Sequence, residues 1–263
     1  MVDFVSKPRY DVNDLRELIS LLCSPDGCPW DREQTHESIR RNMLEEAYET
    51  ADAIDENNAE NLIEELGDVL MQVVFHADIA ERANSFTLDD IADATCKKLI
   101  RRHPHVFGEV RAKNGDESLV FWEDIKREEK HHETTAEAML AVANSLPALW
   151  RAEKIQKKAA KVGFDWPDYK GALDALKDEL TELEDAIEAA SGVEEEIGDL
   201  FFSVVNVARF FDIDPEEALN ATTDKFVTRF NGVERKAFDE GKELENMSLD
   251  DLEELYRKVK LEK

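Results

Sequence analysis

Apolar residues recur every three or four positions along most of the chain, which is the period of an amphipathic α-helix. The clearest case lies near the start, where Leu15, Leu18, Ile19 and Leu22 share one helical face. No segment shows convincing alternation of apolar and polar residues, the pattern of a half-buried β-strand. The pattern therefore predicts an all-α protein.

The helix boundaries follow from this period and from capping residues. Thr87 with Asp90 and Ser248 with Asp251 have the spacing of capping boxes, and Asp214 before Pro215 is typical of an N-cap followed by a first-turn proline. Loops are predicted over residues 24–31 and 105–116. Helices are predicted over about residues 12–23, 35–55, 59–83, 87–102, 117–131, 147–162, 168–190, 193–211, 215–241 and 249–261.

A polar, broken segment divides the chain in two. It predicts an N-terminal module over residues 1–133, a linker over 134–146 and a C-terminal module over 147–263. The halves repeat one another. EELGDVLMQVVF at 64–75 returns as EEIGDLFFSVVN at 195–206, and looser pairs share the same order: CPWD and GFDW, EEAYE and DELTE, KLIRR and KFVTR, WEDIK and YRKVK. Two tandem copies of one helical-bundle module, each with its own site, explain this order.

Paired carboxylates are the candidate chemistry of each copy. Glu46 and Glu49 are three residues apart on one predicted helix, and Glu65 and Asp68 are three apart on the next. Each pair projects from one face, and the short connection makes the helices antiparallel neighbours. Four carboxylates so placed need a cation, and Mg²⁺ prefers oxygen ligands. The second copy offers the corresponding set Glu179, Glu182, Glu196 and Asp199.

Each ligand helix also contains a glycine, Gly67 or Gly198, although glycine inside a helix costs about 1 kcal/mol relative to alanine. Its small size predicts close approach of a neighbouring helix or of substrate. The apolar run that follows predicts a helix anchored in the core.

Composition limits the possible partners. The chain of 263 residues has 61 acidic and 33 basic residues and a formal net charge of −28. With so many acids, an isolated acidic pair is most simply a solvated helix face. Only the duplication of the acidic pairs in register favours a metal site. Such a charge disfavours nucleic acid and anionic lipid as partners. No apolar run has the length of a membrane span, and an odd count of three cysteines suits the reducing cytoplasm. The predicted location is cytoplasmic.

The acid pattern, together with CPWD, RRHPHVF, KIQKKAAKVGFDW and EEIGDLFFSVVN, resembles the MazG family of nucleoside triphosphate pyrophosphohydrolases over about residues 14–260. The motifs are specific in combination. The resemblance implies an all-α homodimer that hydrolyses NTPs and dNTPs to the monophosphate and pyrophosphate with Mg²⁺, which Mn²⁺ can replace. It also implies the four acids of each copy as metal ligands.

The resemblance further assigns phosphate binding to Lys225 and Arg229, and base stacking to Tyr256, where the family usually has tryptophan. The repeat extends these roles to Lys98, Arg102, Trp122 and Lys126. Asp178 opens the second acidic motif in place of the usual glutamate, and Asp178 or Glu45 could accept a proton from water. The catalytic set is therefore Asp178, Glu179, Glu182, Glu196 and Asp199.

Other interpretations remain open. A di-iron carboxylate bundle needs Glu-x-x-His on two helices; Glu33 with His36 and Glu129 with His132 have that spacing but lie away from the acidic helices. His103 and His105 could hold zinc or dock a loop. An acidic helical adaptor without turnover would also fit the charge. Between the two modules, family resemblance favours the C-terminal one as the main catalyst, with a weaker N-terminal site, although the N-terminal residues alone look as complete.

Overall fold

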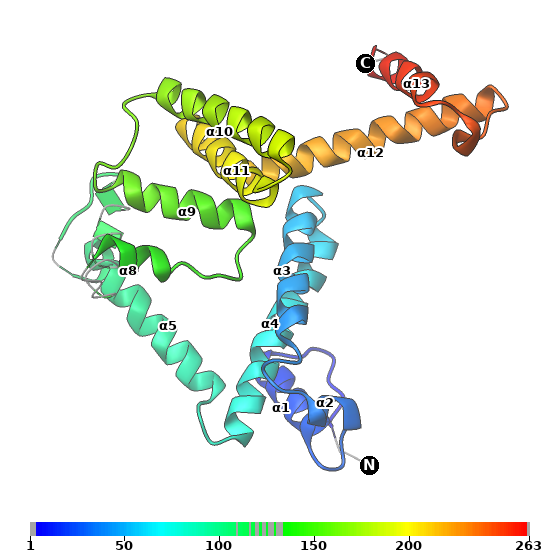
Figure 1. The fold of residues 1–263 in the computed structure, drawn as a ribbon. Helices are drawn as coiled ribbons and strands as arrows, with labels where there is room; N and C mark the ends of the chain where they lie inside the picture. Colours follow the sequence, from blue (N-terminus) through cyan, green and yellow to red (C-terminus); the bar gives the residue numbers. More distant parts are fainter. Residues whose placement is uncertain are drawn as a thin grey trace. The chain divides into compact units, whose positions relative to one another are not determined.

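A computed structural model describes the chain except residues 1–3, 109, 116, 119–120, 123–124, 126–128, 130–133 and 262–263. The chain divides into two compact units, residues 1–130 and 131–263 (Figure 1). Every regular element in the described residues is helical, which confirms the predicted all-α class. None of the helices described combines the length and the hydropathy that a bilayer crossing requires.

Unit 1 is organised around its longest helix, α4. Its C-terminal half packs against α1, and its N-terminal half pairs with α3 in an antiparallel hairpin. The core joins Ile19 of α1, Ile39, and Val74 and Phe75 of α4, all buried. The helices of this unit are α1 (Val12–Cys23), α2 (Pro29–Glu33), α3 (Arg40–Asp55), α4 (Ala59–Arg82), α5 (Leu88–Arg102) and α6 (Pro104–Phe107).

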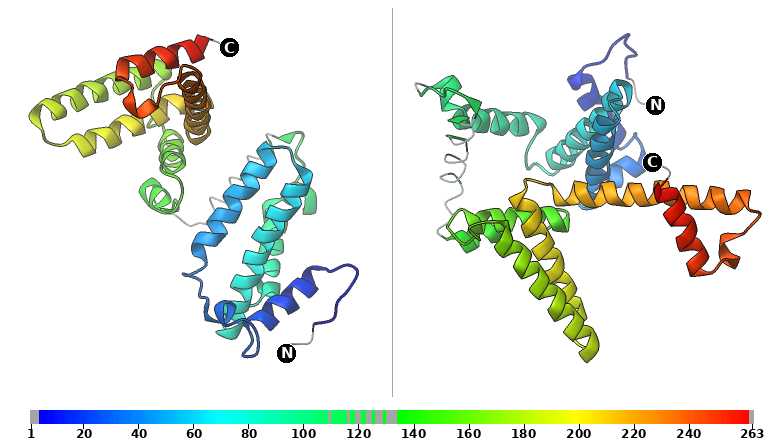
Figure 2. Two further views of the ribbon diagram at one scale, coloured as in Figure 1. Left: turned by 90° about the vertical axis from the view of Figure 1, so that its right-hand side faces the viewer. Right: turned by 90° about the horizontal axis from the view of Figure 1, so that it is seen from above.

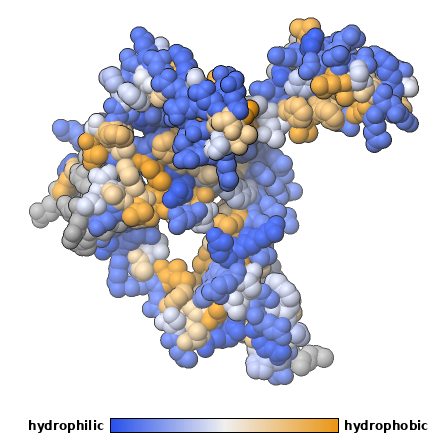
Figure 3. Space-filling view, in the orientation of Figure 1, coloured by the Kyte–Doolittle hydropathy of each residue, from blue (hydrophilic) through white to orange (hydrophobic). Residues whose placement is uncertain are grey.

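Unit 2 repeats the hairpin with α10 and α11, which make its most extensive helix pair. The long helix α12 leaves the base of this hairpin, and α13 folds back on the far half of α12 (Figure 2). Val233, Ala237 and Leu255 are the buried centre of that arm, and other apolar side chains of the arm reach its surface (Figure 3). The elements are α8 (Thr135–Leu140), α9 (Ala148–Ala160), α10 (Tyr169–Ala189), α11 (Val193–Phe210), α12 (Pro215–Asp239), the 3-10 helix Leu244–Asn246 and α13 (Leu249–Leu261).

Most predicted boundaries agree with the structure to within two residues. The capping box at Thr87 and Asp90 is present, Asp214 accepts the N–H groups of Glu216 and Glu217, and Ser248 bonds Asp251. These contacts satisfy backbone donors that a helix leaves free at its start. The capping residues therefore explain why the predicted helix starts agree with the structure.

Four predictions were wrong in detail. The loop predicted over 24–31 contains the start of α2, because Pro29 occupies the first helical position. Helix α6 likewise begins with a proline, Pro104, and extends into the other predicted loop. The predicted linker contains α8, which starts with a capping box between Thr134 and Glu137. Helix α3 begins at Arg40 rather than near 35, because hydrogen bonds between Thr35 and Ser38 hold a turn there. The helix predicted over 117–131 falls partly outside the described residues.

The three cysteines are unpaired and sit in different environments. Cys23 is buried in the α1–α4 core, and its burial raises the pKa of the thiol to about 12. Cys96 is exposed on α5, and Cys28 is half-buried at the start of α2. The thiol of Cys23 is therefore protonated throughout the physiological pH range.

Candidate metal and nucleotide site

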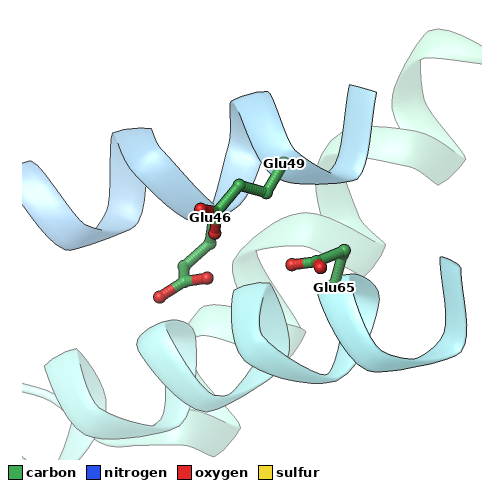
Figure 4. A group of neighbouring side chains, drawn as sticks. All are labelled: Glu46, Glu49 and Glu65. Carbon is green, nitrogen blue, oxygen red and sulfur yellow. The ribbon is translucent and has the colours of Figure 1, made fainter. Parts of the chain in front are cut away.

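The α3–α4 hairpin gathers carboxylates as predicted. Oxygen atoms of Glu46, Glu49 and Glu65 lie within 4.8 Å of one another, on the facing sides of the two helices (Figure 4). Asn58 caps α4 by accepting two backbone N–H groups, which fixes the short turn between the helices. The hairpin thereby holds three acidic groups at a spacing that one cation can bridge.

Asp68 belongs to the same cluster through its charge. Burial, and then the charges of Asp68 and Glu49, raises the pKa of the Glu46 carboxyl. Burial, and then the charges of Glu49 and Asp68, raises the pKa of Glu65. Burial and like charges therefore both disfavour the ionised form of the cluster when no cation is bound.

The α10–α11 hairpin repeats this arrangement with a different compact trio. Glu179, Glu196 and Asp199 lie within 4.8 Å of one another. The pKa of Glu179 is raised by burial and then by the charges of Asp199, Glu182 and Glu196. The pKa of Glu196 is raised by burial and then by the charges of Glu182 and Asp199. Glu182 thus stands beside the trio as Asp68 does in unit 1, and all four predicted acids of each copy interact.

The donor set suits a hard divalent cation. Each cluster offers only carboxylate oxygens and remains partly open to solvent, so waters and phosphate oxygens can complete an octahedral shell. Among the described residues, neither His36 nor His103 joins a group of three metal-binding side chains. His36 instead lies 2.8 Å from His76, Nδ1 to Nδ1, and His103 directs Nδ1 to the Leu99 carbonyl oxygen. His132 of the di-iron alternative lies outside the described residues.

One polar residue at the cluster was not predicted. Gln72 is buried and hydrogen-bonds Glu46, which partly offsets the rise in that carboxyl's pKa. The available signal was the single amide inside the apolar run VLMQVVF. Ser203 interrupts the second run and is also buried, so each copy places one polar side chain below its acids.

The two glycines face open space within the described residues. A Cβ atom built on Gly67 or Gly198 meets no atom within 4 Å. The predicted close approach of a neighbouring helix is therefore absent among the described residues, and the space beside each glycine stays open. The glycines' cost to helix stability has no compensation from packing in one chain.

Gly198→Ala is accordingly expected to stabilise the chain by about 1 kcal/mol, because alanine replaces glycine in a helix. It should lower activity when a substrate or a second copy occupies the space beside Gly198. Thermal unfolding and turnover measured together test both parts. Gly241→Ala is the matched control. Gly241 has φ +68, so alanine there is strained and should lower the melting temperature. A destabilised Gly198→Ala chain would contradict this interpretation of the open space.

The apolar runs after the acids differ between units. Val74 and Phe75 are buried and anchor α4 as predicted. In α11, Phe201, Phe202 and Val204 are exposed, although Val205 is buried. In the second copy, the predicted anchoring in the core therefore holds for only part of the apolar run.

The predicted phosphate-binding residues of unit 2 lie on α12. Lys225 is exposed and Arg229 half-buried, and no ion pair to either occurs among the described residues. Phe226, next to Lys225, contacts the ring of Tyr256 at 5.9 Å between centroids. Asp199 lies eleven residues before the end of α11, or roughly 16 Å along the helix, while α12 leaves from that end (Figure 2). Among the described residues, neither cation is therefore paired with an acid of its own chain's cluster.

The corresponding residues of unit 1 are in a different state. Lys98 is exposed, whereas Arg102 is largely buried and lies 5.3 Å above the ring of Trp122. Arg102 also donates hydrogen bonds to Glu129, at 2.5 Å from Nη2 and 3.0 Å from Nε. The predicted role of Lys126 concerns a residue outside the described ones. The repeat therefore conserves the type of cation but not its surroundings.

Comparison with known proteins agrees with this architecture. A family model described as the MazG nucleotide pyrophosphohydrolase domain matches residues 34–107 and 168–233, which include both acid clusters. The chain is 46% identical over 248 residues to the nucleoside triphosphate pyrophosphohydrolase/pyrophosphatase MazG of Thermotoga maritima, covering 93% of this chain and 94% of that one. It is 41% identical over 254 residues to the nucleoside triphosphate pyrophosphohydrolase of Escherichia coli K12, covering 95% and 97%. The uncharacterised YabN of Bacillus subtilis is 45% identical, with 95% of this chain and 52% of that protein covered.

Proposed function

This chain belongs to the MazG nucleotide pyrophosphohydrolase family, and from that membership we propose that it hydrolyses nucleoside triphosphates, both NTPs and dNTPs, to the monophosphate and pyrophosphate. The observation that carries the proposal is the duplicated acid cluster, built at the same place on two helical hairpins. An enzyme that hydrolyses a polyphosphate with a divalent cation needs such a cluster of acids to bind the cation.

The acids of unit 2 would hold Mg²⁺, or Mn²⁺ in its place, through Glu179, Glu182, Glu196 and Asp199. When bound, the ion supplies charge neutralisation of the triphosphate and a lowered pKa for an attacking water. In the reaction, the water oxygen bonds to the α-phosphorus while the bond from that phosphorus to the bridging oxygen breaks. A carboxylate accepts the water proton, and Lys225 and Arg229 receive the charge that develops on the pyrophosphate.

Asp178 is our choice for the proton acceptor. It opens the acidic motif of α10, and the described residues form no ion pair with it. Its counterpart Glu45 is held by Arg41 at 2.7 Å. A carboxylate that no cationic side chain holds is free to turn toward a water at the metal, which favours unit 2 as the main catalytic module.

A homodimer completes the proposed site. Ile197, Phe201 and Val204 form an exposed apolar stripe on α11, and Leu66 and Leu70 repeat it on α4. Burial of such stripes against a second copy would remove apolar area from water. It could also bring cations from one chain to the acids of the other.

The remaining partners follow from charge and chemistry. A net charge of −28 attracts divalent cations and disfavours nucleic acid or an anionic membrane surface. A nucleotide would therefore need bound metal and the local basic residues Lys225 and Arg229. The unpaired cysteines suit the cytoplasm, where thiols stay reduced.

Product identity tests the proposed function. ATP and one dNTP are incubated with the chain and Mg²⁺, and pyrophosphate and orthophosphate are measured separately at early times. Pyrophosphate with the monophosphate is expected. A diphosphate with orthophosphate as first products would refute the proposal, no turnover would favour an acidic adaptor, and bound iron with a visible absorption band would favour the di-iron bundle.

Mg²⁺ is expected to raise the melting temperature at pH 7.5 by a few degrees at about ten times its Kd. The cation relieves repulsion among carboxylates whose pKa values the fold raises above their ordinary 4.5. In the window just above pH 4.5 the folded chain binds more protons than the unfolded chain, so the repulsion cost fades as pH falls. The Mg²⁺ effect should fade with it, because protons and metal compete. An equal shift with K⁺ at matched ionic strength would argue against specific sites.

A further inference from the structure

A cluster at the end of α5 distinguishes the two modules. Glu129 accepts hydrogen bonds from Arg101 Nε at 2.5 Å and from Arg102 Nη2 at 2.5 Å, and Arg102 stacks over Trp122. The side chains of Arg102 and Glu129 are only 14% and 16% exposed. We define these four residues as the Glu129 clamp.

The contacts of the clamp are charge-assisted and firmly held. Hydrogen bonds from the two guanidinium groups, with Arg102 the larger cause, lower the pKa of the Glu129 carboxyl to about 2. Glu129 is therefore ionised at any pH at which the enzyme would work. Protonation does not open the clamp in that range.

The clamp uses the donors that a phosphate would need. A guanidinium presents a fixed fork of N–H groups that matches carboxylate and phosphate alike. With Nε and Nη2 of Arg102 both directed to Glu129, one edge of that fork is filled. The face of Trp122 that would stack a base is covered by the same guanidinium. A nucleotide must displace this internal carboxylate to use the filled edge of Arg102 or the covered face of Trp122.

The acid of the clamp is not repeated in unit 2. Counting from the aromatic pair Trp122 and Tyr256, the position of Glu129 corresponds to Lys263. Counting from the pair Arg102 and Arg229, the position of Arg101 corresponds to Thr228. Arg229, the counterpart of Arg102, has no ion pair within the described part of the chain. The difference is thus built into the sequence of the two copies.

We propose that Glu129 acts as an internal competitor of the triphosphate at the N-terminal module, occupying Arg102 and closing Trp122, so that this module binds nucleotide weakly and unit 2 carries most turnover. The proposal rests on the proposed function, because it assumes that Arg102 serves phosphate. Glu129 is a specificity-determining residue here and takes no part in bond breaking.

The test uses the full chain with Glu179→Gln, which disables the C-terminal cluster, and adds Glu129→Gln. Binding of a magnesium-complexed ATP analogue that cannot be cleaved between the α- and β-phosphorus is measured by calorimetry. Affinity should rise on the order of tenfold, the worth of one charge-assisted contact, and residual pyrophosphate release should rise with it. Asp93→Asn is the matched control: it removes an acid that pairs with Lys97 at 2.5 Å on the same helix and should leave both values unchanged.

Two further measurements distinguish the proposed competition by Glu129 from a purely structural role of that residue. Glu129→Gln should lower thermal stability while it raises affinity, and in an Arg102→Ala background it should raise nothing. Glu129→Asp, which keeps the charge with a shorter reach, should give a smaller gain and serves if the glutamine variant does not fold. Unchanged affinity in the variant that folds, or failure of both to fold, overturns the proposal. If the unsubstituted chain releases no pyrophosphate, the proposed function itself fails, which is a different result.

Discussion

Glu179→Gln is expected to lower the rate of pyrophosphate release by ~10²–10³-fold, the scale of losing one strong electrostatic contact at a reaction centre. Glu179 belongs to the compact trio of unit 2 and interacts with each of the other three acids. Glutamine keeps the size of the side chain and one oxygen donor but removes the charge. Turnover of ATP and of one dNTP at saturating Mg²⁺ measures the effect.

Glu46→Gln is the matched control, because Glu46 holds the same place in the cluster of unit 1. It should cost much less, since Glu45 is paired with Arg41 and Arg102 with Glu129 in that module. If Glu46→Gln abolishes turnover while Glu179→Gln spares it, the assignment of the main catalytic module is reversed.

Phe201→Asp is expected to convert the proposed dimer into a monomer, raising its Kd by roughly a thousandfold, as for an interface hot spot worth about 4 kcal/mol. Phe201 lies in the centre of the α11 stripe and is 54% exposed in the single chain. A carboxylate there would have to lose its hydration when the second copy binds. Light scattering and sedimentation at micromolar concentration measure the state.

Loss of turnover should accompany dissociation, because among the described residues neither α12 cation is paired with an acid of its own chain's cluster. Leu140→Asp controls for a charge placed on any exposed apolar residue, since Leu140 is 79% exposed on α8 of the same unit. It should leave a dimer. A natural chain that is a clean monomer and fully active would contradict the proposed assembly.

Local signals predicted most of the fold. The period of apolar residues placed the helices, and caps such as Thr87 and Asp214 placed their starts, because both effects depend on neighbours within one turn. The acid clusters were predictable for the same reason: a spacing of three residues sets one face, and a short turn sets the second helix against the first.

The failures concern groups whose surroundings come from distant parts of the chain. The repeat predicted the same role for Arg102 and Arg229. In the structure the partner of Arg102 is Glu129, which lies 27 residues away. No local sequence pattern predicts that contact. The exposure of Phe201 was equally hidden, since an apolar run has the same composition whether its own chain or a second copy covers it. The open space at Gly198 belongs to this class too.

The contrast between Cys23 and Cys96 gives the molecule a built-in reporter. A thiol alkylates through its thiolate, so Cys23, buried and with a pKa of about 12, is slow to react, whereas Cys96 is open to solvent. With Cys28→Ser, a maleimide spin label would attach at Cys96 on α5, the helix that also carries Arg102. In a dimer each particle then holds two labels, and the distance between them follows α5 of the two copies as nucleotide binds.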